Sequence, residues 1–201
     1  MDIRETVLRG RRVVLEPLRV EHAEELIPQV ADDDGMWTWY TAPPRTLDAM
    51  RSWIEARRAP FAEGKALAFA QRDAASGRLF GSTSIFDIDA RFRSAEVGHT
   101  WIAAPWRGTG VNTEAKLLLF RHCFETLGLV RVQIATHAAN ARSRKAIEKV
   151  GGTFEGVLRS FRIAPDGTPR DTAIYSIVAT EWPAVKARLT TMVEAPGPAA
   201  S

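Results

Sequence analysis

Pro105-Trp-Arg-Gly-Thr-Gly-Val-Asn112 is the stretch that decides the fold, because it separates two kinds of regular structure. Residues 94–103 before it are predicted to form a β-strand, and residues 111–127 are predicted to form a long helix that ends at Gly128. Another predicted strand follows at residues 130–137. This order of strand, loop, helix and strand predicts two parallel strands joined by a crossover helix.

The same loop carries the main chemical signal. Gly108 and Gly110 allow a tight turn and a close approach of the backbone to a ligand. The helix that follows begins with free N–H groups at its positive end, and this arrangement binds phosphate or pyrophosphate. The loop is not a P-loop, and it lacks the third glycine of a dinucleotide-binding loop because Thr113 stands there. An ordinary turn between a strand and a helix is the alternative.

The rest of the chain predicts antiparallel strands and short helices. Short turns join the candidate strands 66–72, 79–89 and 94–103, and short turns favour antiparallel pairing. Further strands are predicted at 12–18, 153–164 and 170–179, the last two as a hairpin around Pro165–Gly167; helices are predicted from Glu21, from Thr46 to about Glu63, at 141–150 and from near Glu181. The predicted fold class is α+β, with a mixed, mostly antiparallel central sheet and one βαβ crossover, flanked by helices.

Length and composition predict a single domain at residues 1–192, with a disordered Ala/Pro/Gly-rich tail at 193–201. The chain has one cysteine, Cys123, which excludes an intrachain disulfide and a Cys-rich metal site, so no metal is expected. The low cysteine content also predicts a cytoplasmic protein. The net charge of +3 is small and the basic residues are scattered, so the sequence does not predict a nucleic-acid-binding protein. No membrane partner is expected, because a membrane span needs about 20 apolar residues.

Asn140-Ala-Arg-Ser143 gives a second signal directly after the second predicted parallel strand. In open sheets, ligands bind beyond the carboxyl ends of the parallel strands, which is where this segment and the glycine loop both lie. Asn140 is also a good N-cap for the helix that starts at Ala141, and that role alone is the alternative.

Three stretches together resemble the GCN5-related N-acetyltransferases (GNAT), and among them the Rim-type branch that acetylates the N-termini of ribosomal proteins. The stretches are Glu96–Ile102, Trp106–Ala115, and Asn140–Ser143 with Lys149–Gly152. The resemblance runs from about Val13 to Leu189. It implies a GNAT-like fold, acetyl-CoA as the co-substrate, and acetyl transfer to a primary amine by direct attack. Alternatives are succinyl or other acyl transfer on the same fold, and a catalytically silent CoA-binding domain.

The resemblance also implies which residues hold the coenzyme: the loop 107–112 at the pyrophosphate, and the strand ending at Ile102 with Asn140 and Ser143 along the pantetheine arm. The implied cofactor-binding residues are Trp101, Ile102, Arg107, Gly108, Thr109, Gly110, Val111, Asn112, Asn140, Ser143 and Arg144. The chain departs from the family pattern at Asn112, where a small residue is usual, and at His99, where many relatives have tyrosine. Thr100 is one residue extra, and an extra residue in a strand predicts a β-bulge.

The reaction suggests three catalytic residues. A protonated amine must lose a proton before it attacks a thioester, and Glu96 is the candidate base, acting through water. Ser143 is the candidate acid on the thiol side, and His99 is the alternative base. The structural alternatives are an ion-paired Glu96, a helix-capping Ser143 and a hydrogen-bonded core His99.

The acceptor is predicted to be a small-molecule amine or a protein N-terminus, and a homodimer is an open alternative. The acidic and aromatic segment Asp32–Tyr40 suggests a cationic acceptor, with Asp34, Trp37, Trp39 and Tyr40 as the candidate substrate-binding residues. A solvated acidic turn followed by core aromatics is equally compatible with this composition. If the segment only packs, the acceptor pocket is expected on the hairpin around Arg159–Arg170.

Overall fold

A computed structural model of the chain describes residues 1–40, 43–164 and 166–195, and its strands form one eight-stranded sheet. The strand order is β1-β2-β3-β4-β5-β6-β8-β7. β5 and β6 are parallel and the other neighbouring pairs are antiparallel, which confirms the predicted sheet with one βαβ crossover. The strands are β1 (Leu8–Arg9), β2 (Val13–Pro17), β3 (Leu67–Asp73), β4 (Leu79–Asp89), β5 (Ser94–Ile102), β6 (Arg131–His137), β7 (Thr153–Ile163) and β8 (Pro169–Val178).

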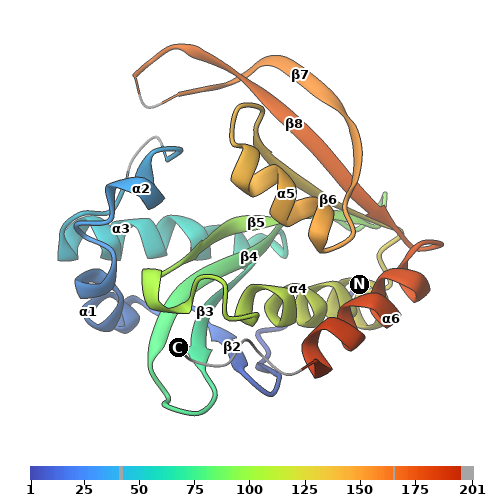
Figure 1. Cartoon of the computed structure of the whole chain (residues 1–201), viewed down its shortest axis with the longest axis horizontal. Coiled ribbons are helices and arrows are strands. Elements are labelled where there is room, and N and C mark those ends of the chain that lie inside the picture. The colour runs from blue at the N-terminus through green and yellow to red at the C-terminus, as the bar shows by residue number, and fades with distance from the viewer. Residues whose placement is uncertain (41–42, 165, 196–201) are drawn as a thin grey trace.

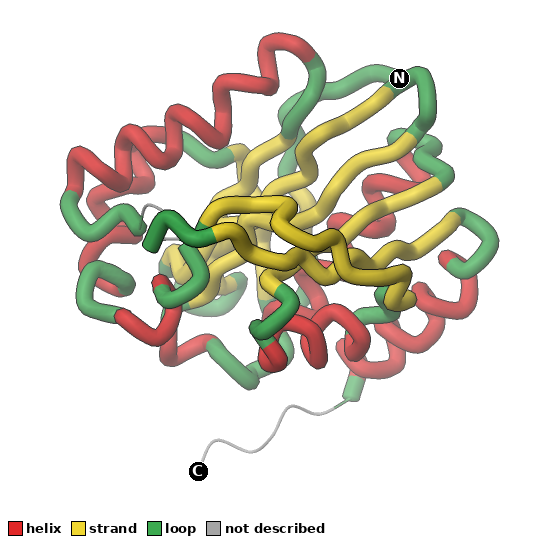
Figure 2. The backbone as a smooth tube through the Cα atoms, turned by 90° about the horizontal axis from the view of Figure 1, so that it is seen from above, coloured by secondary structure: helices red, strands yellow, loops and turns green. Residues whose placement is uncertain are grey.

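Helices lie on both sides of this sheet (Figures 1 and 2). α4 and α6 pack together on one side, while α1 and α3 pack together on the other. The α-helices are α1 (Ala23–Leu26), α2 (Asp34–Trp37), α3 (Leu47–Arg58), α4 (Val111–Arg121), α5 (Ala141–Lys149) and α6 (Trp182–Glu194). A π-turn over His122–Thr126 continues α4, which accounts for the longer helix predicted from the sequence.

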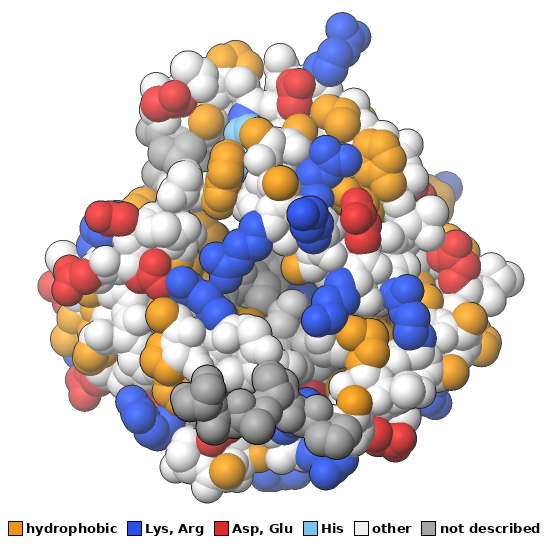
Figure 3. Space-filling model, in the orientation of Figure 1, with side chains coloured by type: hydrophobic (Ala, Val, Ile, Leu, Met, Phe, Trp, Pro, Cys, Tyr) orange, Lys and Arg blue, Asp and Glu red, His pale blue; other side chains and the backbone are white. Residues whose placement is uncertain are grey.

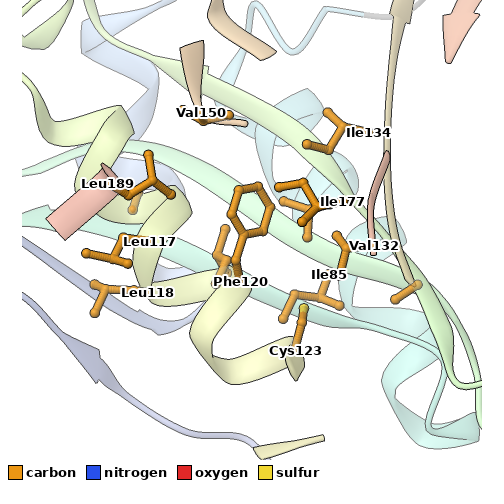
Figure 4. Close-up of a cluster of buried hydrophobic side chains, with 14 of the residues drawn as sticks. Ile85, Leu117, Leu118, Phe120, Cys123, Val132, Ile134, Val150, Ile177 and Leu189 are labelled. Carbon is orange, nitrogen blue, oxygen red and sulfur yellow. The ribbon is translucent and has the colours of Figure 1, made fainter. Parts of the chain in front are cut away.

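Alternation along the strands divides the buried side chains between two clusters. Phe69 and Phe80 belong to the cluster under α4 and α6, whereas their neighbours Ala70 and Leu79 belong to the cluster under α1 and α3. Figure 4 shows Phe120 of α4 among aliphatic side chains from the sheet. Each large apolar side chain buried in this way contributes roughly 1.5–3 kcal/mol, so these two clusters fix the sheet between its helices.

β5 and β6 separate after a short paired segment, and this opening positions the candidate site. Their parallel pairing covers three positions, from Ser94 opposite Arg131 to Glu96 opposite Gln133. Beyond Glu96, the described residues of the two strands form no further pairs with each other. The carboxyl-terminal half of β5 therefore has backbone groups that face an opening instead of a neighbouring strand.

The structure corrects several predicted boundaries near the N-terminus. The helix predicted from Glu21 is broken into 3₁₀ turns on either side of α1, and Pro28 stands in the second of these turns. The helix predicted to reach Glu63 ends as an α-helix at Arg58 and continues as a 3₁₀ turn that contains Pro60. The short strand β1 and the short helix α2, inside a predicted loop, were both missed.

At the other end, α6 extends to Glu194, two residues beyond the predicted end of the domain. The remainder of the predicted tail, residues 196–201, lies outside the described residues, as does Pro165 of the predicted hairpin turn. None of the described helices is long and apolar enough to cross a membrane.

Candidate active site

A cleft of about 1680 Å³ opens where β5 and β6 separate. Residues from α3, β4, β5, α4, β6, α5, β7 and β8 line it, so it runs across the sheet from β4 to β7. Figure 3 shows Lys and Arg side chains gathered around a hollow in the middle of this face. A cleft of this size exceeds the roughly 300–1,000 Å³ of most small-ligand pockets, and it has room for a large coenzyme with an acceptor.

The glycine loop forms one end of the cleft and has the conformation that the sequence predicts. Gly108 and Gly110 have φ angles of 81° and 91°, which side-chain-bearing residues rarely adopt. Gly110 is the N-cap of α4 and no side chain of the described residues caps this helix, so its first N–H groups are free at the end of the cleft that Gly108 and Gly110 line. Asn112 beside them has a buried Oδ1 atom without a hydrogen-bond partner among the described residues.

Basic side chains line the cleft, and one of them, Arg12, lies at this end. Arg12, Arg142 and Lys149 line the cleft, and a Cβ atom on Gly110 would lie 2.8 Å from Nη1 of Arg12. Arg107 has a different role. Its Nε donates to the carbonyl of Ile102 at 2.8 Å and its guanidinium pairs with Asp33, so its side chain ties the loop to α2.

A β-bulge stands at the centre of the cleft, as the extra Thr100 predicted. Between two paired positions, Ser82 and Ser84 of β4 face Trp101 and Gly98 of β5, so β5 has one more residue than β4. His99 takes up the bulge with a φ of 50°. The bulge turns Glu96 and His99 toward the same cleft, a placement that simple alternation could not predict.

Burial shifts the pKa values of Glu96 and His99 in opposite directions. Burial raises the pKa of the Glu96 carboxyl, while a hydrogen bond from Gln133 Nε2 at 2.8 Å opposes part of that effect. Burial lowers the pKa of His99 to about 3, and the charges of Arg57 and Arg162 act in the same direction. The His99 ring stacks on Phe86 at 4.0 Å, so His99 is a neutral ring and Glu96 is the stronger base.

Lys116 is a cleft residue that the sequence analysis missed. Its Nζ donates to the hydroxyls of Thr100 at 2.7 Å and Thr83 at 3.3 Å, directly beneath the bulge. Burial lowers its pKa to about 7, and the buried Cys123 thiol opposes part of that effect. A lysine inside a helix gives no sequence signal of this kind, because its position under the bulge depends on the packing of α4 against the sheet.

Asn140 and Ser143 lie at the cleft beyond the end of β6. Oδ1 of Asn140 accepts a hydrogen bond from the Ser143 N–H at 3.0 Å, so the predicted N-cap is present and still faces the cleft. Arg144 is outside the cleft lining. Its Nε donates to the Tyr175 hydroxyl at 2.9 Å and its guanidinium lies over the Phe154 ring, which points it away from the site.

The structure brings two of the four predicted acceptor residues to the cleft and leaves two outside. Trp39 and Tyr40 line it, and the Tyr40 hydroxyl donates to the Thr100 carbonyl at 3.2 Å. Trp37 is a core residue whose Nε1 donates to the Val30 carbonyl at 2.6 Å. Asp34 is exposed and pairs with Arg45, so neither it nor Trp37 is available to an acceptor in the cleft.

The acetyltransferase (GNAT) domain family matches residues 12–153 of the chain. The chain belongs to the GNAT family of N-acetyltransferases. It is 32% identical over 170 residues to a Bacillus subtilis protein named as a ribosomal N-acetyltransferase, YdaF, with 84% of this chain and 91% of that protein covered. It is also similar to the crystal structure of a GCN5-related N-acetyltransferase from Brucella melitensis, with 31% sequence identity and a TM-score of 0.87. The match covers 96% of this chain and 87% of the Brucella chain.

RimJ of Mycobacterium smegmatis, whose structure is of a complex with CoA-disulfide, is a further solved neighbour of this GNAT chain. It is 26% identical, covers 93% of each chain and has a TM-score of 0.78. The predicted resemblance to the Rim-type branch of the GNAT family is therefore confirmed.

The residues present in this GNAT chain fit coenzyme A. The uncapped α4 N-terminus, the two left-handed glycines and the nearby basic side chains suit a pyrophosphate, and the opening beyond Glu96 suits an extended arm. Nine of the eleven predicted cofactor residues line the cleft; Val111, which packs in the core, and Arg144 do not. Among the described residues, no group of three or more His, Cys, Asp or Glu side chains is placed to hold a metal ion.

Proposed function

We propose that this chain transfers an acetyl group from acetyl-CoA to a primary amine by direct attack, without a covalent enzyme intermediate. The observation that carries the proposal is the separation of β5 from β6 between the glycine loop and Glu96. One cleft thereby joins an anion-binding helix end to a buried carboxylate. Acetyl-CoA, when bound, supplies the acetyl group as an activated thioester.

The glycine loop holds the coenzyme by its pyrophosphate. N–H groups of the first turn of α4 donate to the phosphate oxygens, and Arg12 beside Gly110 adds a positive charge. Trp101 and Ile102 of β5, with Asn140 and Ser143 across the opening, hold the extended arm. Arg107 acts through its ties to Ile102 and Asp33, which fix the loop against β5.

Glu96 is the general base and acts through water. Its raised pKa brings the carboxyl closer to neutrality, where a base removes a proton from an ammonium group most effectively. His99, with a pKa of about 3, is too weak a base for this step. His99 serves instead as a neutral wall of the cleft, stacked on Phe86.

Backbone N–H groups stabilise the carbonyl oxygen as it gains negative charge, and Ser143 donates a proton to the departing sulfur. Of the backbone N–H groups of Trp101 and Ile102, that of Ile102 is the better placed donor. The N–H of Ala103 is used by the Phe80 carbonyl on β4 at 2.7 Å, so alternation turns the N–H of Ile102 toward the opening. Ser143 lines the same cleft from the first turn of α5.

The acceptor is a small-molecule amine or a protein N-terminus that enters between Trp39, Tyr40 and His99. The name of YdaF, a ribosomal N-acetyltransferase, supports a protein acceptor. Burial raises the pKa of Tyr40 to about 12, so this phenol stays neutral and keeps its hydrogen bond to the bulge.

Release of thiol from acetyl-CoA, measured with a panel of amines and with mass spectrometry of the products, tests the proposal. We expect at least one amine to gain 42 Da (about one acetyl group) with stoichiometric thiol release. Calorimetry of acetyl-CoA binding runs beside it. Tight binding without transfer to any amine would make the chain a silent CoA-binding domain, and transfer only from longer acyl-CoA substrates would exclude acetyl as the acyl group.

A further inference from the structure

Three guanidinium groups line the acceptor end of the cleft, and the proposed chemistry uses none of them. Arg57 comes from α3, Arg162 from β7 and Arg170 from β8. No salt bridge joins any of the three to a carboxylate in the described part of the chain. The fold thus gathers three positive charges from three separate elements in one place, none of them in a salt bridge with a described carboxylate.

Such a gathering of like charges is costly for the folded protein. Arg162 and Arg170 stand directly opposite each other in the β7–β8 pair, and like charges at opposite positions destabilise a sheet. Burial lowers the pKa of Arg57, and burial together with the charge of Arg162 lowers that of Arg170. A bound anion would relieve this repulsion, because it compensates all three charges together.

The same arginines also have unused hydrogen-bond donors. The Nε atoms of Arg57 and Arg170 are buried and have no hydrogen-bond partner among the described residues. Arg57 lies over the Trp53 ring at 4.9 Å, and Nη1 of Arg170 donates to the Trp39 carbonyl at 3.4 Å, so both side chains are held in place. A fixed guanidinium with free donors matches the planar, paired oxygens of a carboxylate or a phosphate.

These arginines lie beside the reacting centre and not at the pyrophosphate end. The charges of Arg57 and Arg162 act on His99, and the charge of Arg162 acts on Glu96. The pyrophosphate end has its own set, Arg12 with the glycine loop, at the N-terminus of α4. The carboxylates of Asp32–Asp34, which the sequence suggested for a cationic acceptor, do not line the cleft at all.

We propose that the acceptor carries a carboxylate or phosphate group near its amine, and that Arg57, Arg162 and Arg170 bind this group. The inference rests on the proposed acetyl transfer and names the chemical class of its acceptor. The anion brings the amine to Glu96 and compensates the three charges in the same step. An acceptor whose only charge is its ammonium group meets uncompensated arginines and binds weakly.

Three matched pairs of amines test the inference: glycine and glycinamide, phosphoethanolamine and ethanolamine, and the C-terminally amidated peptides Ser-Asp-Ala-amide and Ser-Asn-Ala-amide. For each pair, thiol release from acetyl-CoA gives the ratio of kcat/KM between the member that carries a carboxylate or phosphate (the anionic member) and the member that lacks it. We expect the wild type to prefer the anionic member of at least one pair. The pair that shows the preference identifies the anion as a carboxylate at the amine, a phosphate or an acidic side chain.

Arg162→Gln should lower that ratio at least about tenfold, since a hydrogen bond to a charged group is worth about 1.5–3 kcal/mol. Arg162 is exposed, so its replacement does not endanger folding, and Arg170→Gln is the second variant. Arg159→Gln, on the same strand and outside the cleft lining, is the matched control and should keep the wild-type ratio. The KM for acetyl-CoA should stay unchanged in all three variants.

A wild type that prefers the anionic member in none of the pairs would overturn the inference, and so would a preference that survives both Arg162→Gln and Arg170→Gln. Calorimetry with the CoA-saturated protein gives a reading that needs no turnover. The anionic members should bind the wild type at least about tenfold more tightly than they bind Arg162→Gln. If no amine is acetylated, the proposed transfer fails while this comparison still decides the anion site, and equal affinities would reject it.

Discussion

The two ends of the cleft are built in different ways. The cofactor end comes from two short segments, residues 107–112 and 140–143, each of which directly follows a strand of the βαβ unit. The acceptor end combines Arg57 of α3, His99 of β5, and Arg162 and Arg170 of the β7–β8 hairpin. The first end is local in the sequence, whereas the second depends on how four distant elements pack.

This difference teaches which features a sequence can reveal. A loop with left-handed residues at a helix N-terminus requires glycines and a capping residue at neighbouring positions of the sequence. A patch of arginines has no such constraint, because any exposed strand or helix can supply one guanidinium. Substitutions at the cofactor end should therefore have large effects of a predictable kind, and those at the acceptor end should act on one substrate only.

Gly110→Asp should have the largest effect and would break the cofactor end. The new side chain meets Arg12 at a φ of 91° and places a negative charge where the pyrophosphate binds. We expect acetyl-CoA affinity, measured by calorimetry, to fall about 100-fold or more, which is about 2.7 kcal/mol. Gly77→Asp is the control, since Gly77 has a φ of 72° in open space on the β3–β4 turn. Equal affinity in wild type and Gly110→Asp would remove the loop from the coenzyme site.

Glu96→Gln should have the next largest effect, at the point where the two ends meet. Loss of the base should lower kcat about 100-fold, with acetyl-CoA affinity almost unchanged. The wild-type rate should fall as the pH drops through the raised pKa of Glu96, because only the ionised carboxylate accepts a proton. The pH–rate profile of Glu96→Gln should lack this decrease at low pH. Glu155, which pairs with Arg131 away from the cleft, provides the control, and Glu155→Gln should keep the decrease. Wild-type turnover in Glu96→Gln would return Glu96 to a structural role.

Lys116→Met should change stability and its pH dependence. Because the pKa of Lys116 is about 7 in the fold against the ordinary lysine value of 10.5, the unfolded chain binds more protons between these two pH values. The free energy of unfolding of the wild type should therefore rise with pH across that window and be lower at pH 7 than at pH 9. Lys116→Met should remove this slope and be more stable at pH 7 by at least about 1 kcal/mol in urea titrations.

Lys145→Met, at an exposed lysine on α5, is the matched control for this stability measurement. It should keep the wild-type pH dependence. If Lys116→Met has the same slope as the wild type, the cost of burying Lys116 is compensated by its hydroxyl partners, Thr83 and Thr100.

Trp39→Ala should have the smallest effect of the predicted losses and sharpens the description of the acceptor end. The indole lines the cleft and meets the His137 ring at 4.7 Å, so its removal should raise the acceptor KM about fivefold, through lost contact area. Added salt should not alter this change, because no net charge is removed. Asp34→Asn is the control and should change the acceptor KM less than about twofold, since Asp34 pairs with Arg45 in solvent.

The sequence was sufficient for most elements because their signals are short-range. Gly128 marked the end of the helix that crosses over between β5 and β6, and Thr46 marked the start of α3, where its hydroxyl accepts from the Ala49 N–H. The two elements that the sequence did not predict, α2 and β1, are too short to show a periodic pattern of apolar residues. The four residues of α2 are too few for a helical period, and β1 is a two-residue strand that exists only because β2 stands beside it.

At the site, the sequence by itself determined the glycine loop, the Asn140 cap, the extra residue in β5 and the candidacy of Glu96. Each of these depends on backbone conformation or on order along the chain, which consecutive residues encode. Only the tertiary structure decided which face Glu96 and His99 share, that Lys116 lies beneath the bulge, and that Arg107 binds Asp33 instead of a phosphate. It also placed Asp32–Asp34 outside the cleft and brought Arg57, Arg162 and Arg170 to its lining, because the position of a charged side chain depends on which elements pack together.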